Sequence, residues 1–326
     1  MNDKTEKKLF IILLILVFFV SAAFGIEYDF IVAKDGSGDF VKLQDVIDTI
    51  PHLRKKRTYV FIKNGIYKEK LILPMTKTNI SFIGENVDST IITYDDFASR
   101  KNIFGENIGT SGSSGFFVNG EGFIAENITF SNTAGLVGQA VAVRVFGDKV
   151  MFKNCKFLGF QDTLYPRGEE SRQYYKGCYI EGTVDFIFGW STAVFDSCHI
   201  HSLSKKGGYI TAASTLKETP FGFVFINCRI TGEPENINCY LGRPWRPYAK
   251  VVYVNCYLGS HIASEGWNNW GNKNNENTAY YAEYHNYGPG SAPDKRVSWS
   301  HQLTKEEAQQ YTIKNIFKDW DPGSGE

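Results

Sequence analysis

The sequence predicts an all-β fold, a right-handed parallel β-helix with an N-terminal capping helix and a C-terminal helix packed outside the coil. A short pattern recurs along the chain: an aromatic or apolar residue, two further residues, a Cys, and another apolar residue two positions on. Between the repeats there are short alternating segments and Gly/Asn turns, with no long amphipathic helix. Parallel strands stacked at such a period indicate a coil, and the handedness of β connections favours a right-handed one.

The repeats define a ladder of equivalent positions. The clearest segments are FKNCKFLG, YKGCYIEG, FDSCHIHS, FINCRITG and YVNCYLGS, and IAENITFS fits with an Ile in the place of the Cys. The ladder comprises Ile128, Cys155, Cys178, Cys198, Cys228 and Cys256, at steps of 27, 23, 20, 30 and 28 residues. A shared register is typical of small buried side chains, so most of the six Cys of the chain are expected to be free thiols. If a disulfide forms, the shortest step favours Cys178–Cys198.

Two helices are expected outside the coil. The segment from Val41 to Leu53 has its apolar residues on one side, and Pro51 limits its length. It is expected to cap the N-terminal end of the coil, where strand edges need cover. The segment from Thr304 to Phe317 begins with a capping box and is expected to pack along the outside.

The N-terminus has the pattern of a secretory signal peptide. Three Lys within the first eight residues precede an unbroken apolar run, 9–20, and small residues follow up to Gly25. Residues 1–25 are therefore predicted to be a signal peptide and residues 26–326 a single catalytic domain, secreted to the periplasm, the cell wall or the exterior. An uncleaved anchor is the alternative, and no second apolar run is long enough to span a bilayer.

Charge gives no reason to expect a nucleic-acid partner. Lys plus Arg and Asp plus Glu both number 35, so the formal net charge is zero. An anionic polymer would have to be held by a local site. A metal site is not expected, because no Cys-x-x-Cys occurs and the six His are scattered.

Two aspartates share the ladder register. Asp162 lies seven residues after Cys155, and Asp185 lies seven residues after Cys178. If the Cys side chains stack, the two carboxylates are about 4.8 Å apart, the spacing of neighbouring strands. Carboxylates this close cannot ionise independently, so one holds its proton to higher pH and an acid stands beside a nucleophile. The alternative is an Asp that only bonds the backbone of a turn.

The neighbours of this pair favour ester cleavage, although a carboxylate spacing near 5 Å also suits a retaining glycosidase. Gln161 precedes Asp162, and Gln139 lies on the preceding repeat. Neutral amide donors suit an oxyanion. Arg243, in the segment LGRPW, supplies a cation.

Five segments, taken in order, resemble the signature blocks of the pectin methylesterases, carbohydrate esterase family 8. The blocks are GIYKE at Gly65, QAVAVR at Gln139, QDTLY at Gln161, VDFIFG at Val184 and LGRPW at Leu241. EGWNNW and AYYAEYHNYGPGS extend the resemblance, which runs from about Phe30 to past Gly290. It implies a right-handed parallel β-helix, in agreement with the repeats.

The resemblance also implies roles for particular residues. It makes Asp185 the nucleophile, Asp162 the general acid and base, and Gln161 a donor to the oxyanion. It makes Gln139 a second oxyanion and substrate contact, and Arg243 the residue that positions the nucleophile and keeps it ionised. The implied groove residues are Trp245, Tyr165, Phe188, Trp267 and Thr110.

The function implied is hydrolysis of the C6 methyl esters of pectin, giving pectate and methanol, with no cofactor and no metal. A monomer without stable membrane association is expected. The alternatives are another pectin-active β-helix enzyme, a glycosidase or a lyase, and a non-catalytic β-helix that binds wall polysaccharide. A lyase of this type would be expected to carry an acidic calcium cluster, and none stands beside the key motifs.

Overall fold

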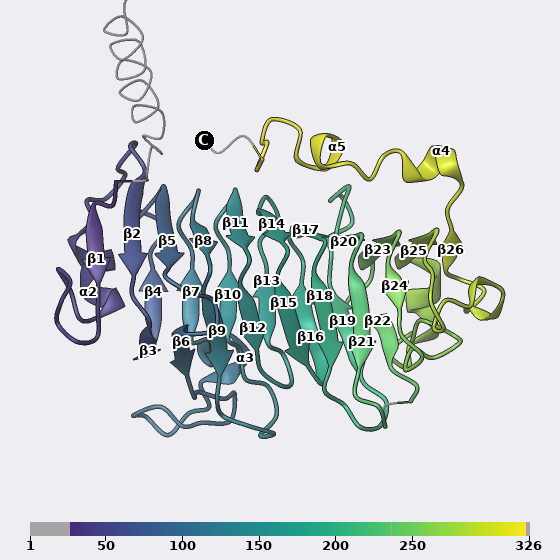
Figure 1. Cartoon of the computed structure of the whole chain (residues 1–326). Helices are drawn as coiled ribbons and strands as arrows, with labels where there is room; N and C mark the ends of the chain where they lie inside the picture. The colour runs from purple at the N-terminus through teal and green to yellow at the C-terminus, as the bar shows by residue number, and fades with distance from the viewer. Residues whose placement is uncertain (1–26, 236, 324–326) are drawn as a thin grey trace, which may run out of the picture.

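The chain folds into a parallel β-helix (Figure 1). The computed structural model describes residues 27–235 and 237–323, and the predicted signal peptide, 1–25, lies outside the described residues. Successive strands join three sheets in turn, and every pairing between named strands is parallel, for example β11 with β14 and β12 with β15. The fold predicted from the repeats is therefore confirmed.

Each sheet runs the length of the coil. Sheet A contains β1 (Phe30–Val32), β2 (Thr58–Ile62), β5 (Ile80–Gly84), β8 (Ile124–Glu126), β11 (Val150–Lys153), β14 (Arg172–Lys176), β17 (Thr192–Asp196), β20 (Phe223–Ile226), β23 (Lys250–Val254), β25 (Tyr280–Tyr284) and β26 (His301–Gln302). Sheet B contains β3 (Gly65–Lys68), β6 (Thr90–Tyr94), β9 (Thr129–Asn132), β12 (Lys156–Leu158), β15 (Tyr179–Gly182), β18 (His199–Ser202), β21 (Arg229–Gly232) and β24 (Tyr257–Leu258). Sheet C contains β4 (Leu71–Leu73), β7 (Phe116–Val118), β10 (Val143–Val145), β13 (Leu164–Pro166), β16 (Val184–Gly189), β19 (Tyr209–Ala213) and β22 (Tyr240–Pro244).

The bend from sheet A to sheet B uses one left-handed residue in most turns of the coil. This residue directly precedes the ladder position, and an Asn or Gly tolerates its positive φ at low cost. Asn154 there also donates a side-chain hydrogen bond of 2.7 Å to Asn127 of the preceding turn. The residues at this bend are Asn127, Asn154, Gly177, Ser197, Asn227 and Asn255, with φ between 48° and 59°.

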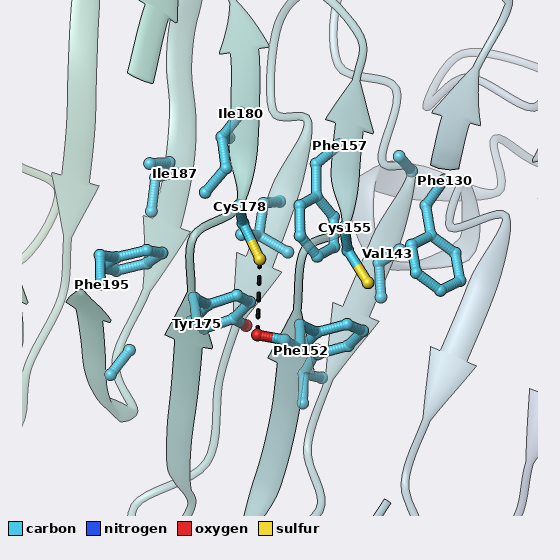
Figure 2. Close-up of a cluster of buried hydrophobic side chains, with 14 of the residues drawn as sticks. Phe130, Val143, Phe152, Cys155, Phe157, Tyr175, Cys178, Ile180, Ile187 and Phe195 are labelled. Atoms are coloured by element: carbon cyan, nitrogen blue, oxygen red, sulfur yellow. Dashed lines mark hydrogen bonds between the residues drawn. The ribbon is translucent and has the colours of Figure 1, made fainter. Parts of the chain in front are cut away.

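The ladder Cys side chains stack inside the coil as free thiols. Lys156 pairs with Tyr179 and Tyr179 with His199, which aligns the Cys before each of them. The Sγ of Cys178 donates to the carbonyl of Phe152 at 3.4 Å, across one turn of the coil (Figure 2). All six Cys are buried, and Cys178 and Cys198 are free thiols, so the Cys178–Cys198 disulfide is absent. Burial raises the pKa of the Cys178 and Cys198 thiols well above the usual value.

Aromatic rings from sheet A form a second stack beside the thiols. Phe152 and Tyr175 have ring centroids 5.2 Å apart, and those of Tyr175 and Phe195 are 4.7 Å apart. The rings of each pair are nearly parallel (Figure 2). The stack continues through Phe225 to Tyr253 at centroid distances of 4.5 and 4.4 Å. These are the aromatic positions of the sequence repeat, so the repeat encodes both columns of the core.

The N-terminal helix is shorter than the sequence suggested. Helix α2 (Leu43–Thr49) buries Leu43, Val46 and Ile47 against the first strands, and it ends at Ile50, before Pro51. It lies at the N-terminal end of the coil, as expected (Figure 1). The remaining short helices are α3 (Gly109–Gly112), η1 (Lys273–Asn277) and η2 (Pro293–Lys295).

The C-terminal segment packs outside the coil as predicted, but it is divided into two helices. Helix α4 (Lys305–Ala308) carries the expected capping box of Thr304 and Glu307. Helix α5 (Ile313–Phe317) begins after Thr312, whose side chain accepts a hydrogen bond from the backbone of Asn315. The break lets Tyr311, Ile316 and Phe317 pack on outward-facing side chains of sheet A, Val194 and Val224 among them. Both helices lie along one side of the coil (Figure 1). Across 27–235 and 237–323, no helix has the length and apolar character needed to cross a bilayer.

Thiol labelling tests the packing of the ladder. Because all six Cys are buried, the native protein should react with a thiol reagent far more slowly than the protein unfolded in guanidinium, which should give six free thiols. Peptide mapping without reduction is the control, and recovery of a Cys178–Cys198 peptide would contradict the structure.

Candidate active site

A cavity of about 510 Å³ lies over the outer face of sheet C. Side chains alternate along these strands, so Val143 and Leu164 point into the core while Arg144 and Tyr165 point outward. The cavity is lined by Ile108, Gly109, Thr110, Ser111, Gln139, Gln161, Asp162, Tyr165, Asp185, Phe188, Ala212, Arg243, Trp245 and Trp270. All of the residues predicted from the sequence are in this set except Trp267.

Asp162 and Asp185 lie on adjacent turns of the coil. The backbone N–H of Asp162 donates to the carbonyl of Val184 at 3.2 Å, which places the two aspartates side by side. Both have left-handed backbones, with φ of 65° and 52°, and both are at least 93% buried. The pairing of β16 with β19 is irregular between Val184 and Ile187, and such a bulge redirects side chains. A left-handed backbone together with a buried carboxyl group makes both positions candidates for a functional site.

Arg243 holds Asp185 by a two-pronged ion pair. Its Nε and Nη2 donate to the two carboxylate oxygens at 2.9 and 2.7 Å. The guanidinium contacts the rings of Tyr209 and Trp270. Its Cζ atom is 3.7 Å from the centre of each ring. The ion pair and the two rings fix the orientation of the Asp185 carboxylate.

The environments of the two carboxyl groups differ. Burial and the neighbouring charge of Asp185 hold the pKa of Asp162 well above its usual range, and the more distant Arg243 opposes this only in part. Burial also raises the pKa of Asp185, but the hydrogen bonds and charge of Arg243 oppose that rise directly. As the pH falls, Asp162 therefore takes up a proton before Asp185 does. The pair thus provides an acid beside an ionised carboxylate.

Two glutamines lie beside the aspartates on one edge of the cavity. Gln139 and Gln161 form a parallel bridge between adjacent turns, and the N–H of Ala140 donates to the carbonyl of Gln161 at 3.1 Å. Their amide side chains line the same cavity as the carboxyl groups. Thr110, on α3, lines the cavity as well.

Aromatic rings form the other side of the cavity. Tyr165 and Phe188 are stacked with centroids 4.1 Å apart, and Phe188 meets Trp245 edge to face at 6.0 Å. Tyr165 and Phe188 are almost wholly buried, whereas Trp245 is partly exposed. A flat, partly wet ring of this kind can contact a sugar.

Trp267 does not line the cavity, contrary to the prediction. It is 1% exposed, and its ring packs against Tyr253 and Tyr281 in the core. It bridges Gly242, the neighbour of Arg243, and therefore points inward where Arg243 points outward. Trp270 takes the expected place, since it covers Arg243 and lines the cavity. Both Trp belong to the segment EGWNNW, which does not reveal by itself which one faces outward.

Sequence reasoning also missed Tyr209, the second ring on Arg243. The sequence repeat does not reveal this contact, because Tyr209 pairs with Tyr240 whereas Arg243 pairs with Ala212, and the pairing is seen only in the structure. Within the described part of the chain, no three His, Cys, Asp or Glu side chains converge as metal ligands would.

Comparisons with known proteins agree on one family. The family model described as Pectinesterase matches residues 29–319. Pectinesterase 31 of Arabidopsis thaliana is 44% identical over 296 residues, covering 88% of this chain and 91% of that protein. Putative pectinesterase 11 of the same plant is 38% identical over 294 residues, covering 89% and 79%.

Solved structures give the same result. The pectin methylesterase from carrot superposes with a TM-score of 0.85 at 33% identity, covering 93% of this chain and 97% of that one. A pectin methylesterase in complex with a hexasaccharide superposes with a TM-score of 0.81 at 29% identity, covering 91% and 99%.

The raised pKa of Asp162 predicts a pH-dependent stability difference. Because the folded state holds this proton above the unfolded pKa of about 3.9, the stabilisation is complete below that pH and is lost as the pH rises through the folded pKa. Asp162→Asn cannot ionise and keeps a residue type that tolerates the left-handed backbone. Its free energy of unfolding relative to wild type should therefore increase between about pH 5 and about pH 8, measured by guanidinium unfolding. Parallel pH profiles for the two proteins would contradict the assignment.

Proposed function

The chain belongs to the pectinesterase family, whose members are carboxylic ester hydrolases, and we propose on that premise that it removes the C6 methyl esters of pectin. The observation that carries the proposal is the ion pair of Arg243 with Asp185 beside a second carboxyl group, Asp162, that retains its proton. An oriented carboxylate nucleophile and an adjacent acid are what cleavage of an ester through a covalent intermediate requires.

In the first step, a carboxylate oxygen of Asp185 attacks the carbonyl carbon of the methyl ester. The carbonyl π electrons move to oxygen and create an oxyanion, and the amides of Gln139 and Gln161 donate hydrogen bonds to it. The two amides belong to adjacent turns of the rigid coil, so they are already in place when the charge develops. The hold of Arg243 keeps the attacking carboxylate ionised and aimed.

In the second step, the intermediate collapses and the bond to the methoxy oxygen breaks. The Asp162 carboxyl gives its proton to that oxygen, and methanol leaves. An anhydride then joins the Asp185 carboxyl to the galacturonate carbonyl. The Asp162 carboxylate takes one proton from a water molecule whose oxygen attacks the galacturonate carbonyl of this anhydride. The bond from that carbonyl to the Asp185 oxygen breaks, which regenerates the Asp185 carboxylate, and the released galacturonic acid gives its remaining proton to solvent. The proton is back on Asp162 for the next ester.

The aromatic side of the cavity is proposed to hold the sugar. Trp245 is partly exposed at the rim and contacts the stacked pair of Phe188 and Tyr165. Burial raises the pKa of the Tyr165 hydroxyl, so it stays neutral and can donate a hydrogen bond beside the acid. Thr110 also lines the cavity and is proposed to contact the sugar.

Two alternatives make different products. A glycosidase would release new reducing ends, and a lyase would release unsaturated products that absorb in the ultraviolet. The amide pair beside Asp162 and Asp185 favours the esterase, because an ester intermediate carries an oxyanion and a glycosyl transition state carries positive charge. Methanol release from esterified pectin, measured beside reducing ends and absorbance, separates all three activities and also a non-catalytic binding role.

We propose that the protein acts outside the cell, as a monomer on pectin polymers. This rests on the basic and apolar pattern of residues 1–25. N-terminal sequencing of the secreted protein tests cleavage near Gly25.

Substitution of each aspartate by Asn tests the mechanism. Asp185→Asn removes the attacking charge, and Asp162→Asn removes the proton donor and the later base. Each should lower kcat for methanol release by about a thousandfold or more, and the double variant should cost little beyond the worse single variant, because both groups serve one covalent pathway. Binding of pectin should survive in each. Near-wild-type methanol release by Asp185→Asn would refute the nucleophile.

Trp245→Ala tests the sugar contact. Because Trp245 is partly exposed at the cavity rim, the change should lower kcat/KM on esterified pectin by about tenfold or more, at little cost in melting temperature. Trp267→Ala is the matched control, since that ring is wholly in the core and its loss should lower the melting temperature strongly. An unchanged kcat/KM for Trp245→Ala would count against the contact.

A further inference from the structure

Two arginines stand on the outer face of sheet C beyond the cavity, and neither has an acidic partner among residues 27–235 and 237–323. Arg144 lies in β10, and Arg167 directly follows β13. In each, the Nε is buried and has no hydrogen-bond partner within the described residues. Other partly buried arginines of the chain, such as Arg172, Arg243 and Arg296, are each paired with a carboxylate. Unpaired arginines at such positions are unusual.

The strand register places these arginines in line with the cavity. Arg144 pairs with Tyr165, which lines the cavity, and so lies one strand farther along the same outer row of side chains. Neighbouring strands are about 4.8 Å apart. The N–H of Arg167 donates to the carbonyl of Val145 at 2.9 Å, so Arg167 lies diagonally beside Arg144 on the same face. A polymer that passes over Tyr165 therefore reaches both side chains.

Aromatic rings hold the two guanidinium groups. The Arg167 group lies 4.6 Å from the ring centre of Trp190, with Tyr165 and Phe146 at 5.5 and 5.6 Å. The Arg144 group lies 4.7 Å from Phe117 and gives one hydrogen bond of 3.2 Å to Asn119. Stacking engages the flat face of a guanidinium, and because the Nε of each arginine is buried, the Nη groups are the in-plane donors left for an acceptor.

The two positive charges oppose one another. The charge of Arg167, together with burial, lowers the pKa of Arg144. Glu169 and Glu170 follow in the chain, but neither forms an ion pair with these arginines among the described residues. An anion placed between the guanidinium groups would relieve this repulsion and complete their hydrogen bonding.

We propose that Arg144 and Arg167 bind the free carboxylate of a galacturonate unit that has already lost its methyl ester, one or two units from the ester being cleaved. Trp190 offers its ring to the same sugar. This inference rests on the proposed function, because it assigns a second position on the same polymer. A methyl ester carries no charge and cannot replace the carboxylate, so the pair selects chains that are already partly de-esterified. New free carboxylates should then arise next to old ones, in runs.

Binding of an unesterified oligogalacturonate tests the site without any turnover. Arg144→Gln and Arg167→Gln should each weaken its affinity by about tenfold at low salt, as expected for loss of one charge-assisted hydrogen bond, and the wild-type affinity should fall at high salt. Arg229→Gln is the matched control, since Arg229 also stacks on a ring, that of Tyr257 at 4.7 Å, but on sheet B. Its affinity should equal that of wild type.

A second measurement compares substrates. The ratio of kcat/KM on a partly esterified oligomer to kcat/KM on a fully esterified one should fall by about tenfold in both variants. If Arg144→Gln does not fold, Arg144→Lys keeps the charge but loses the planar fork, and an intermediate ratio is expected.

Three outcomes are distinct. Unchanged oligogalacturonate affinity in both Gln variants would overturn the carboxylate site. An equal loss in Arg229→Gln would overturn it as well, because it would reveal general charge attraction. Absence of methanol release by the wild type would refute the proposed function, while the binding measurement would still decide whether the arginines hold a carboxylate.

Discussion

The register between successive turns of the coil is the constraint on which the rest of the structure depends. Backbone hydrogen bonds fix neighbouring strands about 4.8 Å apart, and the stacked thiols and rings inside prevent any slip, because a shift of one residue would turn the core face outward. The packing of side chains inside the coil therefore fixes the positions of the polar side chains that line the cavity outside it. Asp162 and Asp185 meet because Cys155 and Cys178 stack.

This scaffold brings like charges together and keeps them from relaxing apart. Asp162 and Asp185 face each other on adjacent turns, and so do Arg144 and Arg167. In a flexible loop such pairs would separate into water. On a rigid coil the repulsion persists and must be relieved by a proton, a partner or a ligand. Arg243 relieves Asp185, a proton relieves Asp162, and among the described residues no carboxylate pairs with either arginine of the second pair.

The sequence predicts the position of a residue when that residue lies at a fixed distance from a position of the repeat. The aspartates were predictable because both lie seven residues after a ladder Cys, and the ladder itself repeats five times. The sequence could not show which of Trp267 and Trp270 faces the core. The isolated bridge between Gly242 and Trp267 decides this, and the segment that contains both Trp lies outside the repeat. The break between α4 and α5 follows from contacts with sheet A, far away in the sequence. Arg144 is part of the sequence block QAVAVR, but the sequence does not distinguish it from other arginines. Only the structure shows that its Nε is buried without a hydrogen-bond partner among the described residues.

The charges along the outer face of sheet C differ between the two ends of the cavity. In the proposed reaction, removal of a methyl ester leaves a new carboxylate beside Asp185, and repulsion between the two like charges favours its departure. The unpaired arginines lie beyond Tyr165 on one side only, while on the other side the charge of Arg243 is already matched by Asp185. If Arg144 and Arg167 bind a carboxylate as proposed, they would attract the new one and so bring the next ester toward Asp185. The chain has no net charge, so this bias must come from the local arrangement and should weaken as salt screens it.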